Sequence, residues 1–234
     1  MHTLMRIVRY LMNVLTYLDF QPSRKKALYL VLGLTALFLL LTAFVYLLPT
    51  TFIDIEFSEE VQEYNSPFLD AVMKGVSWFG TQTVAISLAL ATALVFLMLR
   101  YRWEALFLSL TLLSSVLNFG IKLLVNRPRP TDDLVRIVVK AQHNSFPSGH
   151  TVFYVTFFGF LIFLMYRLRQ FPPAVRWGIG GVSLLLILAV PFSRVYLGAH
   201  WFSDVAAGFM LGLISLIGLI LLYLPSTHSS PPHS

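Results

Sequence analysis

The sequence has no cysteine among its 234 residues, so a disulfide framework and a thiolate metal site are both excluded. Charge is also sparse, because Asp, Glu, Lys and Arg make up only 12% of the chain, whereas soluble domains carry about 25%. The chain is 57% hydrophobic, which excludes a disordered protein. Together these properties disfavour a soluble globular protein.

The charge that is present is mainly positive, with 17 basic and 11 acidic side chains and a formal net charge of +6. This excess suits a nucleic acid, an anionic membrane surface or an anionic substrate. A nucleic-acid site needs a dense basic face, so a chain with so few charges does not favour one. The composition indicates a membrane protein whose main partner is the lipid bilayer.

Apolar runs predict an all-α fold, an integral membrane bundle of six transmembrane helices. A helix needs about 20 apolar residues to cross the hydrocarbon core. The clearest run, 27–48, carries no charge. The predicted spans cover residues 27–48, 83–99 (extending toward Trp78), 105–125, 151–166, 177–192 and 201–224.

The sequence divides into three parts. Polar residues three or four apart predict an amphipathic segment over 1–26 that lies in the cytoplasmic interface. The six-span domain covers 27–225, and the polar tail 226–234 is predicted to be disordered. Among the connections, the acidic stretch 54–63 is interpreted as a solvated connection in preference to a short interfacial helix that covers the site.

Basic residues predict the orientation, because Lys and Arg favour the short cytoplasmic loops. The opposite loop 49–77 has six acidic residues and one basic residue, Lys74. We therefore expect both termini in the cytoplasm of a multi-pass cell-membrane protein. Ten basic residues lie on the predicted cytoplasmic side: Arg6, Arg9, Arg24, Lys25, Lys26, Arg100, Arg102, Arg167, Arg169 and Arg176.

The region 122–148 departs from this rule, because its five basic residues lie on the predicted outer side. Lys122 offers a compact charge and Arg129 a two-pronged donor held between prolines, so we expect both to bind an anionic ligand. For Arg127, Arg136 and Lys140 the favoured interpretation is an interfacial anchor to lipid headgroups.

A second cluster, Ser148, Gly149 and His150, stands at the predicted start of a span. A helix N-terminus attracts anions, glycine allows close approach of the backbone, and the histidine is suited to donate a proton. The alternative is an ordinary capped helix.

A third cluster contains Arg194, His200 and Asp204. Residues four apart on a helix face the same way, and a carboxylate bonded to one imidazole nitrogen leaves the other as a directed base or nucleophile. A polar pair capping a helix is the alternative, which Arg194 disfavours because its guanidinium suits a phosphate.

Together the clusters offer cations, histidines and one carboxylate, with no carboxylate group at metal-ligand spacing beside the histidines. This set suits phosphoryl transfer without metal or cofactor, because the cations can neutralise the phosphoryl charge.

Three motifs in these clusters resemble the signature motifs of the type 2 phosphatidic acid phosphatase (PAP2) superfamily, which also includes vanadium haloperoxidases and glucose-6-phosphatases. They occur in the family's order, and the span pattern extends the likeness to residues 27–224. The motifs are Lys-x6-Arg-Pro (Lys122, Arg129, Pro130), Pro-Ser-Gly-His (Pro147, Ser148, Gly149, His150) and Ser-Arg-x5-His-x3-Asp (Ser193, Arg194, His200, Asp204).

The resemblance implies a role for each of these residues. His200 would be the nucleophile that forms a phosphohistidine, and Asp204 would orient it. His150 would protonate the leaving oxygen and then activate water. The phosphoryl oxygens would be held by Lys122, Arg129, Ser148, Gly149 and Arg194.

The resemblance also implies a metal-independent lipid phosphatase whose site opens near the outer leaflet. Undecaprenyl diphosphate and phosphatidylglycerophosphate fit as substrates equally well, and phosphatidic acid fits less exclusively. The alternatives are a haloperoxidase-like enzyme and a lipid-binding or transport protein. A pair of glycines, Gly208 and Gly212, is interpreted as a close helix contact.

Overall fold

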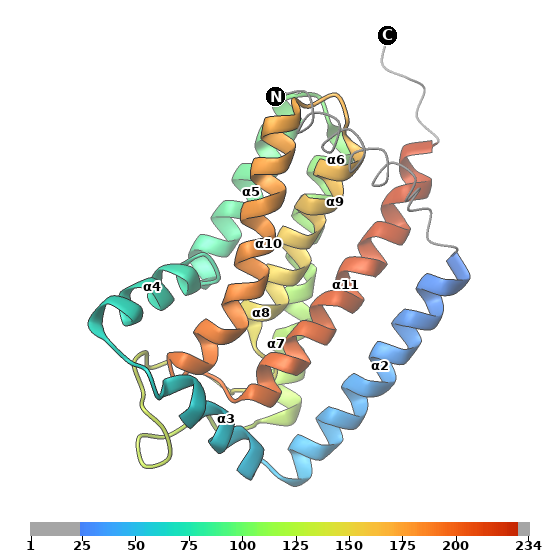
Figure 1. Ribbon diagram of the computed structural model, residues 1–234. Coiled ribbons are helices and arrows are strands. Elements are labelled where there is room, and N and C mark those ends of the chain that lie inside the picture. Colours follow the sequence, from blue (N-terminus) through green and yellow to red (C-terminus); the bar gives the residue numbers. More distant parts are fainter. Residues whose placement is uncertain (1–23, 229–234) are drawn as a thin grey trace, which may run out of the picture.

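The computed structural model describes residues 24–228, and these form helices without any strand. The all-α prediction is therefore confirmed. Figure 1 shows the long helices running alongside one another between two ends of the molecule. The elements are α2 (Arg24–Leu47), α3 (Phe52–Gln62), α4 (Pro67–Trp78), α5 (Gln82–Met98), α6 (Arg102–Leu110), α7 (Leu113–Val125), α8 (Gly149–Phe153), the π-helical turn η1 (Tyr154–Phe158), α9 (Gly159–Arg167), α10 (Pro173–Tyr196) and α11 (Phe202–His228).

The predicted six spans correspond to five helical segments and one bent pair. The five are α2, α6 with α7 (Arg102–Val125), α8 with η1 and α9 (Gly149–Arg167), α10, and α11 as far as Pro225. The sixth joins α4 and α5, which meet at an angle of 51°. α5 alone has 17 residues, and at 1.5 Å per residue it is about 25 Å long, close to the thickness of a hydrocarbon core.

The two predicted flanking segments lie mostly outside the described residues. Of the amphipathic segment predicted over 1–26, only 24–26 are described, and they begin α2. α11 continues to His228, three residues into the tail that was predicted to be disordered over 226–234. Composition predicts where an apolar run lies, but it does not fix the last turn of the helix. The assigned end of a helix commonly varies by one or two residues.

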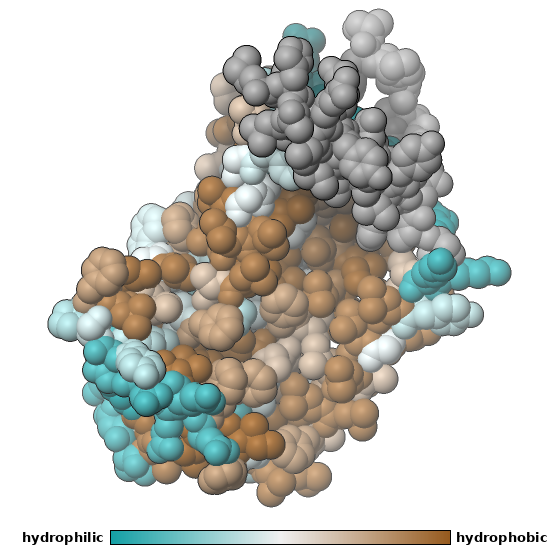
Figure 2. Space-filling model, viewed as in Figure 1, coloured by the Kyte–Doolittle hydropathy of each residue, from teal (hydrophilic) through white to brown (hydrophobic). Residues whose placement is uncertain are grey.

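The surface has the character expected of a membrane protein. In Figure 2 hydrophobic residues cover the middle of the visible face, and hydrophilic residues gather over α3 at one end. Large apolar side chains such as Leu40 and Leu124 are exposed. Exposed leucines over the length of a bundle indicate contact with lipid chains.

The innermost helix is the one formed by α8, η1 and α9, and α11 packs closely against its beginning. A Cβ atom at Gly208 would lie 2.7 Å from the carbonyl oxygen of Ser148, and one at Gly212 would lie 2.7 Å from Val155 Cβ. The predicted close contact at this glycine pair is confirmed. It fixes the Ser148 turn against the first turns of α11.

Candidate active site

The three motif clusters meet at one end of the bundle, where α7 and α10 end and α8 and α11 begin (Figure 1). His200 lies in the turn between α10 and α11. Its Nε2 atom is 3.3 Å from Arg129 Nη1, and its Nδ1 atom is 3.4 Å from Asp204 Oδ2. The two nitrogens of one imidazole therefore face groups of opposite charge.

Asp204 is fully buried in the first turn of α11. Its Oδ2 atom accepts the backbone N–H of Trp201 at 3.0 Å and the hydroxyl of Ser145. Its Oδ1 atom accepts a hydrogen bond from Arg127 Nη1 at 2.5 Å. These contacts fix the carboxylate on the Nδ1 side of His200.

The loop 126–148 wraps around two of the cations. Lys122 Nζ donates to the carbonyl oxygens of Asn144 and Ser145 at 2.7 and 2.9 Å. The Arg129 guanidinium donates to the carbonyls of Gln142, His143 and Ala199. Backbone oxygens orient both side chains without neutralising their charge.

Arg194 is buried in the last turn of α10. Its Nη1 atom donates to the hydroxyl of Ser77 on α4, whereas its Nε atom is buried without a hydrogen-bond partner. Within residues 24–228, Lys122, Arg129 and Arg194 form no ion pair with a carboxylate. Burying cations without counter-ions is costly, and it leaves charge available for an anionic ligand.

The Pro-Ser-Gly-His segment borders the same site. Ser148 is the N-cap of α8, as its position predicts, and its backbone N–H donates to the carbonyl of Asp204 at 3.0 Å. A Cβ at Gly149 would lie 3.1 Å from the amide nitrogen of Asn118. His150 packs against Gly80, where a Cβ atom would overlap the histidine ring. The glycines therefore leave room for close approach at both positions.

The electrostatics of the site favour an uncharged His200. Burial lowers the pKa of His200 well below its ordinary value of 6.5, and the nearby cations Arg129, Lys122 and Arg194 lower it further. At neutral pH the ring is then unprotonated, so one of its nitrogens carries a lone pair. Such a nitrogen is able to act as a nucleophile or base.

The headgroup-anchor interpretation of Arg127 is wrong. Its side chain is 0% exposed, and it contacts Asp54 on α3 and Asp204 on α11 at 2.6 and 2.5 Å. Arg136 also has a protein partner, since it forms two hydrogen bonds with Asp70 on α4. Sequence gives no signal for either pair, because the partners lie more than 60 positions away along the chain.

The interpretation of 54–63 as a solvated connection is likewise wrong. Residues 52–62 form α3, and its Asp54, Ser58 and Gln62 side chains are buried. The Gln62 amide donates to the carbonyls of Arg136 and Tyr196 at 2.8 and 2.9 Å. α3 is thus packed onto the loop 126–148 and the end of α10. Ser145, beside Asp204, is a further site residue that the motifs do not contain.

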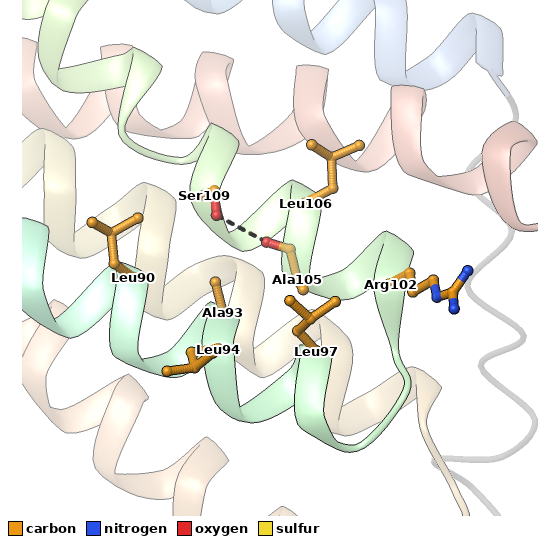
Figure 3. A pocket seen from close by; sticks show the side chains of 8 residues that line it. All are labelled: Leu90, Ala93, Leu94, Leu97, Arg102, Ala105, Leu106 and Ser109. Atoms are coloured by element: carbon orange, nitrogen blue, oxygen red, sulfur yellow. Dashed lines mark hydrogen bonds between the residues drawn. The ribbon is translucent and has the colours of Figure 1, made fainter.

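Two further features bear on possible ligand sites. No three His, Cys, Asp or Glu side chains between residues 24 and 228 are grouped as metal ligands. A groove of about 390 Å³ opens between α5 and α6, toward the end opposite the site (Figures 1 and 3). Its lining is mainly apolar and includes none of the predicted site residues: Leu90, Ala93, Leu94, Leu97, Arg102, Ala105, Leu106 and Ser109.

Comparisons with known proteins agree with the motifs and with the fold. Phosphatidylglycerophosphatase B of Bacillus subtilis is 26% identical over 188 residues, which are 80% of this chain and 91% of that protein. The crystal structure of a transmembrane PAP2-type phosphatidylglycerolphosphate phosphatase from Bacillus subtilis superposes with a TM-score of 0.71 at 25% identity, over 88% of this chain and all of that one.

A shorter match is found with the putative undecaprenyl-diphosphatase YbjG of Escherichia coli K12, which is 31% identical over 88 residues, 38% of this chain and 39% of that protein. The family model of the PAP2 superfamily matches residues 103–228. That range contains all three motif clusters and more than half of the chain. The chain therefore belongs to the PAP2 superfamily and is an integral membrane protein of its lipid phosphatase branch.

Proposed function

We propose that this enzyme hydrolyses the phosphate ester or diphosphate of a membrane lipid through a phosphohistidine on His200, without a metal ion. One observation carries the proposal. Lys122 and Arg194 are buried and Arg129 is half-buried, and within residues 24–228 none of the three has a carboxylate partner. They surround His200, which is itself buried and whose pKa is lowered by burial and by these cations. A phosphoryl group would supply the missing negative charge, and the cations would stabilise its transition state.

In the first step, Nε2 of His200 forms a bond to phosphorus while the bond from phosphorus to the lipid oxygen breaks. The imidazolium form of His150 donates a proton to that leaving oxygen, and the Nδ1–H of His200 donates a hydrogen bond to Asp204. In the second step, His150 takes a proton from water as the water oxygen bonds to phosphorus. The phosphorus–nitrogen bond then breaks, which releases phosphate and restores both histidines.

Ser148 and Gly149 complete the predicted phosphate site from the side of α8. The Ser148 turn is fixed to α11 by its hydrogen bond to Asp204. The space above Gly149 is bordered by Asn118, whose Oδ1 atom is buried and unpartnered. The Asn118 Oδ1 atom is an acceptor, so it suits a donor such as the attacking water, whereas the backbone N–H of Gly149 is a donor that suits a phosphoryl oxygen.

For the lipid, we propose phosphatidylglycerophosphate and undecaprenyl diphosphate as the two leading substrates, with phosphatidic acid third. The names of two relatives support the first two. Phosphate release from the three lipids in matched detergent micelles ranks them directly. Equal rates on all three would contradict the two leading substrates.

We propose further that the site faces the extracytoplasmic side. Arg100, Arg102, Arg167 and Arg169 lie at the opposite end of the bundle, and the acidic α3 lies at the site end (Figures 1 and 2). Because the chain has no cysteine, a single Cys at Glu59 or Arg169 can be labelled in intact cells with an impermeant maleimide. Glu59→Cys should react and Arg169→Cys should not, and the reverse pattern would invert the orientation.

The central experiment measures phosphate release by the purified protein in detergent with EDTA present. We expect unchanged turnover after chelation, and at least about a 10⁴-fold loss in His200→Ala, because the nucleophile is gone. His143→Ala is the matched control, since His143 lies in the loop 126–148 but has no predicted role. Loss of activity on chelation, or full activity in His200→Ala, would overturn the mechanism.

A further inference from the structure

Asp54 is a buried carboxylate that none of the three motifs contains. It lies in the first turn of α3 and is 0% exposed. Its Oδ1 atom accepts the backbone N–H and the hydroxyl of Ser203 at 2.9 and 2.7 Å. Its Oδ2 atom accepts Arg127 Nη2 at 2.6 Å and the Thr51 hydroxyl at 2.9 Å. A charge buried this deeply needs compensation by its partners.

Arg127 connects this carboxylate to the site. Its Nη2 atom binds Asp54, and its Nη1 atom donates to Asp204 Oδ1 at 2.5 Å and to the Ser203 hydroxyl at 2.8 Å. Its Nε atom donates to the carbonyl of Pro49 at 2.7 Å. The guanidinium therefore joins two carboxylates, one from α3 and one from α11.

The charges of these three residues do not cancel. Asp54 and Asp204 each carry one negative charge and Arg127 one positive charge, so the group has a net charge of −1. This group lies on the Nδ1 side of His200, through Asp204 at 3.4 Å. An Arg127–Asp204 pair alone would be neutral, and there would then be no net charge on the Nδ1 side of His200. In a buried site one such charge has a large effect on a nearby ring.

We infer that Asp54 is a positioning residue that acts through Arg127 to keep a net negative charge behind His200. The inference rests on the proposed function, in which the imidazole becomes positive as Nε2 bonds to phosphorus. Arg127 holds Asp204 in place but offsets its charge, and Asp54 restores that charge. α3 thereby contributes to the chemistry although it contains no motif residue.

The effect on His200 adds to that of every other charged or titratable group facing it. The anionic group Asp54, Arg127 and Asp204 favours a positive ring, whereas the cations disfavour one. The remaining groups around the ring come from α7, α8, α10 and the loop 126–148: Lys122, His150, Arg194 and Arg129.

Charge substitutions separate this role from a packing role. Asp54→Asn keeps the shape of the side chain and makes the group neutral, so the pH at which His200 takes up a proton should fall. Arg127→Gln makes the group more negative, so that pH should rise. The double variant Asp54→Asn/Arg127→Gln returns the net charge to −1, so its titration should lie close to that of the wild-type protein. A packing role would instead make the double variant the most disturbed.

The titration is followed by NMR of histidine-labelled protein in detergent, with the His200 signal assigned by its loss in His200→Ala. We expect the midpoints of the two single variants to differ by about one pH unit or more. We also expect kcat to fall about tenfold in Asp54→Asn while KM stays nearly constant, because less positive charge is stabilised in the transition state. The matched control is Gln62→Ala, which loosens α3 without changing charge and should leave the His200 midpoint unchanged.

The outcomes distinguish the two proposals. Coincident midpoints in Asp54→Asn and Arg127→Gln, with His200→Ala inactive, overturn the role of Asp54 and leave the proposed function standing. Full activity in His200→Ala overturns the proposed function itself. If a single variant does not fold, the double variant decides, because a midpoint displaced from that of the wild type contradicts the charge argument.

Discussion

The two sides of His200 differ in how their charges are satisfied. On the Nδ1 side, Arg127 is paired with Asp54 and Asp204. On the Nε2 side, Arg129 and Arg194 are held by carbonyl or hydroxyl oxygens and have no carboxylate partner in the part of the chain that the structure describes. Arg194 on the Nε2 side is as deeply buried as Arg127, so exposure to water does not explain the difference between these two arginines.

This difference separates an arginine whose charge the protein itself neutralises from arginines whose charge it leaves without a carboxylate. A buried guanidinium with two carboxylates is complete, and removing either partner is destabilising. A buried guanidinium with a free Nε atom, as in Arg194, gains most when an anion arrives. Arginine occurs on both sides of His200, so the residue type does not distinguish the two roles. The distinction depends on whether the hydrogen-bond partners are carboxylates.

Removal of a cation on the Nε2 side of His200 should affect turnover far more than stability. Arg194→Gln should lower kcat by about 10²- to 10³-fold, because one preorganised donor to the transition state is lost. The stability of the variant should hold, because Arg194 forms no ion pair with any residue in 24–228. Phosphate release and thermal unfolding in detergent measure the two effects. The matched control is Arg176→Gln on the same helix, α10, at the end opposite the site.

A loss of folding in Arg194→Gln with normal turnover in the surviving protein would contradict this assignment. Arg194 would then stabilise the fold, as Arg127 does, and the two sides of His200 would be alike.

The comparison also shows what the sequence could and could not predict. Hydropathy located the spans, because burial in lipid requires continuous apolar runs. The motif residues Lys122, Arg129, Ser148, Arg194, His200 and Asp204 are predicted to lie together because each lies at or close to the end of a predicted span. Asp54 and Arg127 were misinterpreted, because their pairing joins positions 73 apart and depends on how α3 packs. Acidic composition alone made α3 look like a solvated connection.

A smaller effect is expected when orthophosphate binds on the Nε2 side of His200 and supplies negative charge to the cations there. Orthophosphate binding should stabilise the folded protein by about 2.7 kcal/mol at a concentration 100 times its dissociation constant. The corresponding rise in unfolding temperature should be much reduced in Arg129→Gln, whose guanidinium is 3.3 Å from His200 Nε2. Arg169→Gln, at the opposite end, should keep the full rise. An undiminished rise in Arg129→Gln would place the phosphate elsewhere.

The smallest effect concerns His200 itself, where the two sides meet. Its pKa is lowered in the folded protein by burial and by the nearby cations, whereas an unfolded chain takes up the proton near pH 6.5. Below that pH the unfolded state binds more protons, so stability falls as the pH falls, by at most about 1.4 kcal/mol per pH unit for this one group. Unfolding temperatures between pH 7.5 and 5.5 should therefore drop more steeply in the wild-type protein than in His200→Asn. Parallel slopes would mean that His200 binds its proton equally in both states, and the cations of the Nε2 side would then not act on the ring.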